Sequence, residues 1–183
     1  MTSEAPAPGD GWLVVVDAQA IFADPATSQW GSPMWASVVP RIVERVEEFG
    51  PERTVFTRFV ADPGLGGSWE PYYADWAFAL VPDADPLYAV VPELADLARR
   101  SPVVTAGTFG KWNADLRAVV GDQPHLTLTG VSTDCCVIST ALPAADAGAT
   151  IVVDAAGCAG STPENHERAL SAMALFGPQV TIA

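Results

Sequence analysis

The sequence predicts a three-layer α/β fold in which helices cover both faces of a mostly parallel, six-stranded sheet. A length of 183 residues suits a single domain, taken here as residues 1–183. Hydrophobic residues make up 49% of the chain and charged residues 17%, which excludes intrinsic disorder and indicates a well-buried interior. Short β-branched segments alternate with segments of helical periodicity, and that alternation is typical of parallel strands joined by crossover helices.

Six segments are predicted as strands because apolar and β-branched residues run between turn signals. They are residues 12–16, 54–59, 102–105, 126–129, 150–153 and 179–182. The first ends at Asp17 and the fifth ends at Asp154. Because the carboxyl ends of parallel strands meet at one edge of the sheet, we expect the active groups at that edge.

Helices are predicted between these strands, where apolar residues recur every three or four positions. They are residues 38–49, 72–80, 92–100, 113–120, 136–147 and 163–176. Gly50 stops the first, and Thr162 with Pro163 starts the last. Pro143 lies inside the fifth and disfavours its middle. Residues 60–71 contain three glycines and predict a loop, and residues 1–11 predict a loose N-terminal arm.

The charge balance limits the partners. Nine Lys and Arg residues against 22 Asp and Glu residues give a net charge of −13, which disfavours nucleic acid and anionic membranes. No signal peptide or membrane span is predicted. The three cysteines are an odd number, and two of them, Cys135 and Cys136, are adjacent. We therefore expect free thiols, a cytoplasmic location and a small-molecule substrate.

Two candidate catalytic residues follow predicted strands. Asp17 stands where a fully apolar strand stops, and a carboxylate there can accept a proton, although a turn residue is an equal interpretation. The second candidate is a thiol of the polar turn of residues 130–137, which carries Cys135 and Cys136 at the start of a predicted helix whose dipole favours a thiolate. The alternative is that a cysteine packs as a small hydrophobic residue, which is our interpretation of Cys158.

The third candidate is Lys111. Eight of the nine basic residues are arginines, so Lys111 is the only lysine. A lone lysine is usually a solvated surface charge. Beside Asp17, however, its compact ammonium would keep the carboxylate ionised and stabilise developing charge.

Aromatic residues and one arginine are candidates for substrate binding. Phe22, Trp69 and Trp112 would form a dry slot for a small planar amide or aromatic acid. Arg58 would pair with a substrate carboxylate, although an ion pair with an Asp or Glu of the protein is an equal interpretation. Tyr72 and Trp76 share a helical spacing, so Trp76 is assigned to a packing face instead.

Three sequence blocks resemble the isochorismatase-like cysteine hydrolases, a superfamily that includes nicotinamidase, N-carbamoylsarcosine amidase and biuret hydrolase. The likeness runs from about Trp12 to the C-terminus, and its blocks are residues 14–19 with Phe22, residues 108–112, and residues 130–137 with Thr140 and Ala141. The resemblance implies a Rossmann-like fold and a triad in which Asp17 is the base, Cys136 the nucleophile and Lys111 the third member. It also implies a cis peptide before Ser132, an oxyanion hole made by the N–H groups of Ser132 and Cys136, and a homo-oligomer.

The chain departs from this pattern at the lysine and at the metal site. Many relatives carry the lysine just after the third strand, where this chain has Ala106, five residues before Lys111. Either Lys111 reaches the site from the loop, or an Asp–Cys pair works alone, or the protein is inactive. Nicotinamidases bind a metal through an Asp-x-His that is missing here, and His125 and His166 are predicted at a strand edge and on a helix surface. We expect no metal and no cofactor.

The leading hypothesis is a cysteine hydrolase that cleaves a C–N bond of a small amide or ureido compound through a thioester. The first alternative is vinyl ether hydrolysis of the isochorismatase type, with the aspartate as general acid. The second is a non-catalytic binding protein on the same scaffold.

Overall fold

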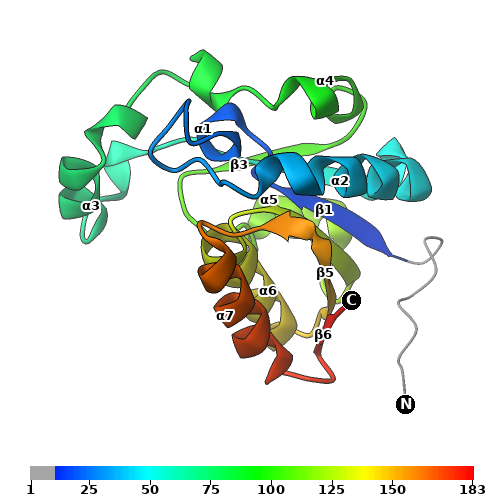
Figure 1. Ribbon diagram of the computed structural model, residues 1–183. Coiled ribbons are helices and arrows are strands. Elements are labelled where there is room, and N and C mark those ends of the chain that lie inside the picture. Colours follow the sequence, from blue (N-terminus) through cyan, green and yellow to red (C-terminus); the bar gives the residue numbers. More distant parts are fainter. Residues whose placement is uncertain (1–10) are drawn as a thin grey trace.

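A computed structural model describes residues 11–183, so the predicted arm lies, apart from Gly11, outside the described residues. The sheet has six strands, all parallel, in the order β3-β2-β1-β4-β5-β6 (Figure 1). Their bounds are β1 Trp12–Val16, β2 Thr54–Phe59, β3 Val103–Ala106, β4 His125–Val131, β5 Thr150–Ala159 and β6 Val180–Ile182. The predicted fold class is confirmed.

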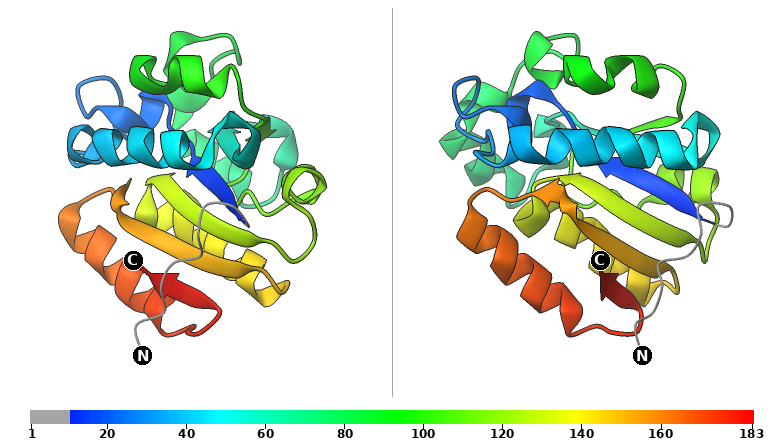
Figure 2. Two further views of the ribbon diagram at one scale, coloured as in Figure 1. Left: turned by 90° about the vertical axis from the view of Figure 1, so that its right-hand side faces the viewer. Right: turned by 45° about the vertical axis from the view of Figure 1, so that its right-hand side comes forward.

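Helices cover the sheet on both faces, as Figure 2 shows. Their bounds are α1 Ala20–Ala23, α2 Trp35–Phe49, α3 Trp69–Asp75, α4 Pro92–Ala98, α5 Ala114–Val120, α6 Ile138–Asp146 and α7 Pro163–Ala174. Leu13 and Val15 of β1 pack in one hydrophobic cluster with α2 and α4. Val14 and Val16 pack in the other with α5, α6 and α7. Successive residues of β1 thus point to opposite layers, which is why this strand is apolar throughout.

The fifth strand is longer than predicted. β5 continues through Asp154 to Ala159 instead of ending at that aspartate. The Nε groups of Arg41 and Arg45 on α2 donate to Asp154 Oδ2 at 2.9 and 2.6 Å, so this buried carboxylate has two cationic partners. A charged residue can stand inside a strand when its charge is paired in this way.

The predicted helices differ from the observed ones by a few residues at their ends, and two of them differ more substantially. The segment predicted over 72–80 forms α3 at Trp69–Asp75, and the chain leaves the helix at Trp76 before a 3₁₀ turn at Ala77–Ala79. Trp76 packs against Trp30, a contact that local periodicity could not show. The segment predicted over 136–147 divides into a π-type turn, Thr133–Val137, and α6.

Gly130 lets β4 pass closely beside β1 just below the edge of the sheet. Its φ is +111°, and a Cβ there would lie 2.1 Å from the Val16 carbonyl oxygen. Gly130→Ala is therefore expected to lower the free energy of unfolding by about 3 kcal/mol, measured by urea denaturation. Gly121→Ala is the control, because Gly121 also has a positive φ of +90° but nothing lies within 4 Å of its Cβ position; a loss of about 1 kcal/mol is expected there. Equal losses in the two variants would contradict the close approach.

None of the helices within residues 11–183 is both long enough and apolar enough to cross a bilayer.

Candidate active site

Asp17, Lys111 and Cys136 come together at the carboxyl edge of the sheet. Asp17 directly follows β1, Lys111 lies in the loop between β3 and α5, and Cys136 lies in the turn after β4. β1 lies between β2 and β4, so its carboxyl end faces the turn that carries the cysteine. Asp17 and Lys111 are fully buried, and Cys136 is 3% exposed.

The Asp17 carboxylate is held by an ion pair and a hydroxyl group. The Lys111 ammonium contacts Oδ2 at 2.9 Å. Thr57 Oγ1, from the neighbouring strand β2, donates to Oδ1 at 2.6 Å, and the Asp17 backbone N–H donates to that same hydroxyl at 3.1 Å. Asp17 also has a φ of +46°, the one positive φ among the non-glycine residues described. Oδ2 has no polar partner other than the Lys111 ammonium within residues 11–183, which leaves a lone pair available for a proton.

The Lys111 side chain is held in place by Asp17 and by two backbone carbonyl groups. Its Nζ donates to the carbonyl oxygens of Thr108 and Phe109 at 2.6 and 3.0 Å and lies 5.5 Å from the centre of the Phe59 ring. Burial is the largest single effect and lowers the pKa of Lys111, but the Asp17 charge, the two neighbouring cysteines and the hydrogen bond to Asp17 together outweigh it, so the pKa is raised overall. The ammonium therefore stays charged.

The backbone of Lys111 is tied to the turn that carries the cysteine. Its N–H donates to Thr140 Oγ1 at 3.0 Å, and that hydroxyl donates to the Cys136 carbonyl at 2.7 Å. In the structure Lys111 reaches Asp17 from the loop, which is the geometry that the first of the three alternatives for the lysine requires. Ala106 ends β3, five residues earlier.

The Cys136 thiol is not a ready-made thiolate. Its pKa is raised well above the ordinary value by the adjacent Cys135 side chain, by burial and by the Asp17 charge, while Lys111 opposes these effects. The prediction that the helix start favours a thiolate is not supported here, because the Cys135 side chain, burial and the Asp17 charge all favour the protonated thiol. Cys136 needs a base to lose its proton.

The turn around Cys136 is tightly built. The peptide bond between Val131 and Ser132 is cis, and the N–H groups of Cys135 and Val137 both donate to the Ser132 carbonyl at 3.0 Å. The Nδ1 atom of His166, on α7, lies 2.8 Å from Thr133 Oγ1, and His166 is only 6% exposed. The prediction that His166 sits on a helix surface is therefore wrong, since its side chain packs beneath this turn.

A pocket of about 280 Å³ opens beside the thiol. Phe22 lines it, in agreement with the sequence prediction. The other lining residues are Gln29, Trp30, Gly31, Phe59, Tyr72, Trp76, Phe109, Ser132, Asp134, Cys135, Cys136 and Ser161. Sequence reasoning missed Trp30, which precedes α2 in a segment without periodicity, and assigned Trp76 to packing alone.

Three residues predicted to bind substrate do not line this pocket. Trp69 packs behind it, with ring centres 4.8 Å from Phe109 and 5.7 Å from Tyr73. Trp112 packs against the hydrophobic cluster on the other face of the sheet. These two predictions are not supported, because each indole ring is used in packing.

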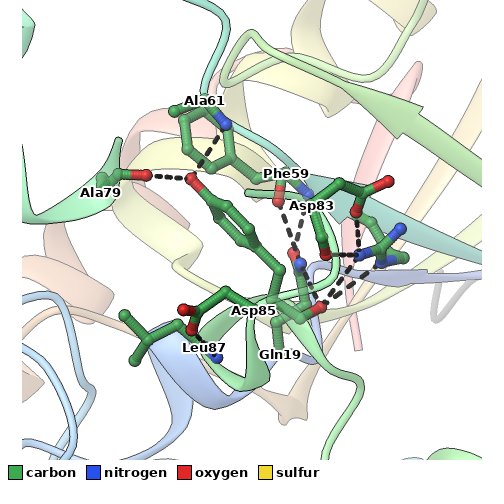
Figure 3. A network of polar contacts seen from close by, with 9 residues as sticks. Gln19, Phe59, Ala61, Ala79, Asp83, Asp85 and Leu87 are labelled. Atoms are coloured by element: carbon green, nitrogen blue, oxygen red, sulfur yellow. Dashed lines mark hydrogen bonds and ion pairs between the residues drawn. The ribbon is translucent and has the colours of Figure 1, made fainter. Parts of the chain in front are cut away.

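Arg58, the third of these residues, also points elsewhere. Its Nη2 forms an ion pair with Asp83 at 2.6 Å and a hydrogen bond to the Tyr88 carbonyl at 3.3 Å. Figure 3 shows Asp83 in the polar network around Gln19. The prediction that Arg58 binds a substrate carboxylate is not supported, since the Arg58 guanidinium already forms an ion pair with the carboxylate of Asp83.

Gln19 holds together the backbone segments next to the site. Its Nε2 donates to the carbonyls of Phe59 and Tyr88 at 3.0 and 2.9 Å, and its Oε1 accepts from the Phe59 N–H at 2.7 Å (Figure 3). The amide thus links the chain after β1 to the end of β2 and fixes Phe59, which lines the pocket. The only sequence feature that pointed to a role for Gln19 in the site is its position two residues after Asp17.

The described residues do not form a cluster of metal ligands. No group of three or more His, Cys, Asp or Glu side chains within residues 11–183 could hold an ion. Asp62, which follows β2, instead accepts a hydrogen bond from the Gly64 N–H at 2.8 Å. No catalytic step is therefore assigned to a metal.

Comparison with known proteins identifies one family. The family model of the isochorismatase domain matches residues 11–183. No curated protein sequence matches this chain.

Solved structures share the fold at low sequence identity. A cysteine hydrolase from Pseudomonas syringae pv. phaseolicola 1448A superposes with a TM-score of 0.82 at 17% identity, over 100% of this chain and 94% of the other. An isochorismatase-like hydrolase from Alkaliphilus metalliredigens gives 0.71 at 20% identity, over 96% and 94%. The nicotinamidase PncA from Bacillus subtilis gives 0.72 at 22%, over 93% and 97%. The match of the family model over nearly the whole length shows that the chain belongs to the isochorismatase domain family, and the protein is a hydrolase.

Proposed function

We propose that this hydrolase cleaves a C–N bond of a small amide or ureido compound through a thioester on Cys136. The observation that carries the proposal is the buried Asp17–Lys111 ion pair, 2.9 Å from Nζ to Oδ2, at the same sheet edge as a buried, pocket-lining thiol. A thiol with a raised pKa requires a base, and Asp17 Oδ2 has only the Lys111 ammonium as a polar partner within residues 11–183.

In the first half of the reaction, Asp17 Oδ2 takes the thiol proton and Cys136 Sγ attacks the substrate carbonyl carbon. The oxygen that becomes negative is held by the backbone N–H groups of Ser132 and Cys136. When the tetrahedral intermediate collapses, the C–N bond breaks and the protonated Asp17 gives its proton to the leaving nitrogen. The products are a free amine or ammonia and a thioester.

In the second half, Asp17 takes a proton from water, and the resulting hydroxide attacks the thioester carbonyl. The C–S bond breaks, the proton returns to Sγ, and the acid leaves. Lys111 does not contact the substrate in this scheme, because its ammonium is held by Asp17 and two carbonyl oxygens. Its role is to keep Asp17 ionised at the start of each cycle.

The pocket favours a small, flat substrate. Its volume of about 280 Å³ is slightly below the usual range for drug-sized ligands, and six of its thirteen lining residues are aromatic. We further propose that the protein is cytoplasmic, since all three thiols are free, and that it acts as a homo-oligomer without a cofactor, nucleic acid or membrane partner.

The test is ammonia release from a panel of small amides and ureido compounds that includes nicotinamide, pyrazinamide and N-carbamoyl amino acids. For any compound that is cleaved, acid quenching during turnover followed by mass spectrometry is expected to show an acyl adduct on the peptide that contains Cys136. Cys136→Ser provides the matched control, in which a thioester cannot form. Turnover without any adduct, and at an equal rate in Cys136→Ser, would refute the covalent mechanism.

A further inference from the structure

The substrate pocket contains no cation that could bind an anionic substrate. None of the nine Lys and Arg side chains lines it. Lys111 is fully buried and paired with Asp17, and Arg58 of β2 is paired with Asp83. Burial lowers the pKa of His166, which does not line the pocket. A substrate carboxylate would therefore lose its hydration without gaining a partner.

The pocket does contain one carboxylate, Asp134, which lies one residue before Cys135 in the catalytic turn. Its position is fixed by Ser161 in the segment between β5 and α7. The Ser161 N–H donates to Oδ1 at 2.7 Å, and the Ser161 hydroxyl donates to Oδ2 at 2.6 Å. No basic side chain within residues 11–183 forms an ion pair with Asp134, so its negative charge is stabilised by hydrogen bonds but not neutralised by a cation.

Aromatic rings complete the wall. Trp30 lies 6.0 Å from Tyr72 and 5.9 Å from Trp76 between ring centres, and all three line the pocket. The faces of such rings attract cations, and the attraction grows when the site is partly dry. The protein's charge of −13 also draws cations toward the surface.

We propose that Asp134 makes this pocket select by charge: the preferred substrate is a flat amide that carries a positive group beyond the amide, and an isosteric anion is rejected. This inference deepens the proposed function, since it presumes that the amide lies at Cys136. Asp134 acts here on specificity and takes no part in the proton transfers.

Three benzamides of nearly equal shape test the inference: meta-(aminomethyl)benzamide as the cation, meta-methylbenzamide as the neutral compound and meta-carbamoylbenzoate as the anion. Their dissociation constants are measured by calorimetry on full-length Cys136→Ala protein, which binds without turnover. The cation is expected to bind at least about tenfold more tightly than the anion, with the neutral compound between them. Asp134→Asn, which preserves the shape, is expected to reduce the cation-to-anion ratio to about threefold or less while leaving the neutral compound unchanged.

Asp75→Asn is the matched control. It removes one negative charge from an exposed residue at the end of α3 that does not line the pocket, so the ratio should stay near that of the parent protein. An anion that binds as tightly as the cation, a ratio unaffected by Asp134→Asn, or binding of none of the three compounds would overturn the inference. Because binding is measured without catalysis, these failures are distinct from failure of the hydrolytic mechanism, which would appear as the absence of an acyl adduct in turnover experiments.

Discussion

Cys136→Ala is expected to lower the rate of hydrolysis of any accepted substrate by at least about 10⁴-fold while leaving the fold intact. Without Sγ no thioester can form, and the remaining groups only bind and polarise the carbonyl. The variant should remain folded because alanine keeps the Cβ and removes a single buried atom. Steady-state kinetics with circular dichroism on the same samples checks both parts.

Cys158→Ala is the control for loss of a buried thiol. Cys158 is also fully buried, but it lies on β5 with its Sγ 3.6 Å from the Leu128 carbonyl, and it does not line the pocket. Its hydrolytic rate should stay within about twofold of the parent protein. If Cys136→Ala kept its activity while Asp17→Asn lost it, the aspartate would be working alone as a general acid, as in vinyl ether hydrolysis, and the thioester mechanism would be wrong.

Lys111→Met is expected to lower the free energy of unfolding by about 3–5 kcal/mol and to abolish activity. Methionine keeps most of the side-chain volume but leaves the Asp17 carboxylate fully buried without its cation. A buried charge that loses its partner carries most of its desolvation cost uncompensated. Urea denaturation at pH 7 measures the loss.

The double variant Asp17→Asn with Lys111→Met separates charge from packing. It removes both charges at once, and the Thr57 hydroxyl can still hydrogen-bond to the asparagine side chain that replaces the carboxylate; most of the lost stability should return. Activity should not return, because the base is gone. A loss below about 1 kcal/mol in Lys111→Met, or no recovery in the double variant, would contradict a tightly coupled pair.

The same ion pair gives stability a defined pH dependence. The pKa of Lys111 is raised above its ordinary value of 10.5, so protonation of this lysine favours the folded state. Its contribution is fully present below pH 10.5 and is lost only as the pH rises through the folded-state pKa. Titration of Lys111 should therefore leave the stability of the parent protein unchanged across neutral pH and lower it in strongly alkaline solution, and this alkaline loss should be smaller in Lys111→Met, as measured by denaturation at several pH values.

The local chemistry of the chain was sufficient to predict the order of the six strands and of helices α2 to α7, but not the short helix α1. The apolar run before Asp17 and the Thr162–Pro163 helix start match β1 and α7 because each depends on neighbouring residues only. The passage of β5 through Asp154 was not predictable in this way. It depends on two arginines more than a hundred residues earlier in the chain, which neutralise the buried carboxylate.

The composition and motifs by themselves determined the α/β class, the three candidate catalytic residues and the unusual status of Lys111 as the only lysine. Only the tertiary structure decided that this ammonium lies against Asp17, that Arg58 pairs with Asp83 instead of facing the pocket, and that Trp30 lines the pocket. The physical reason is the same in each case. A side chain's charge or ring is defined by its residue type, but its partner is set by which loops the sheet brings to one edge, and those loops are distant in sequence.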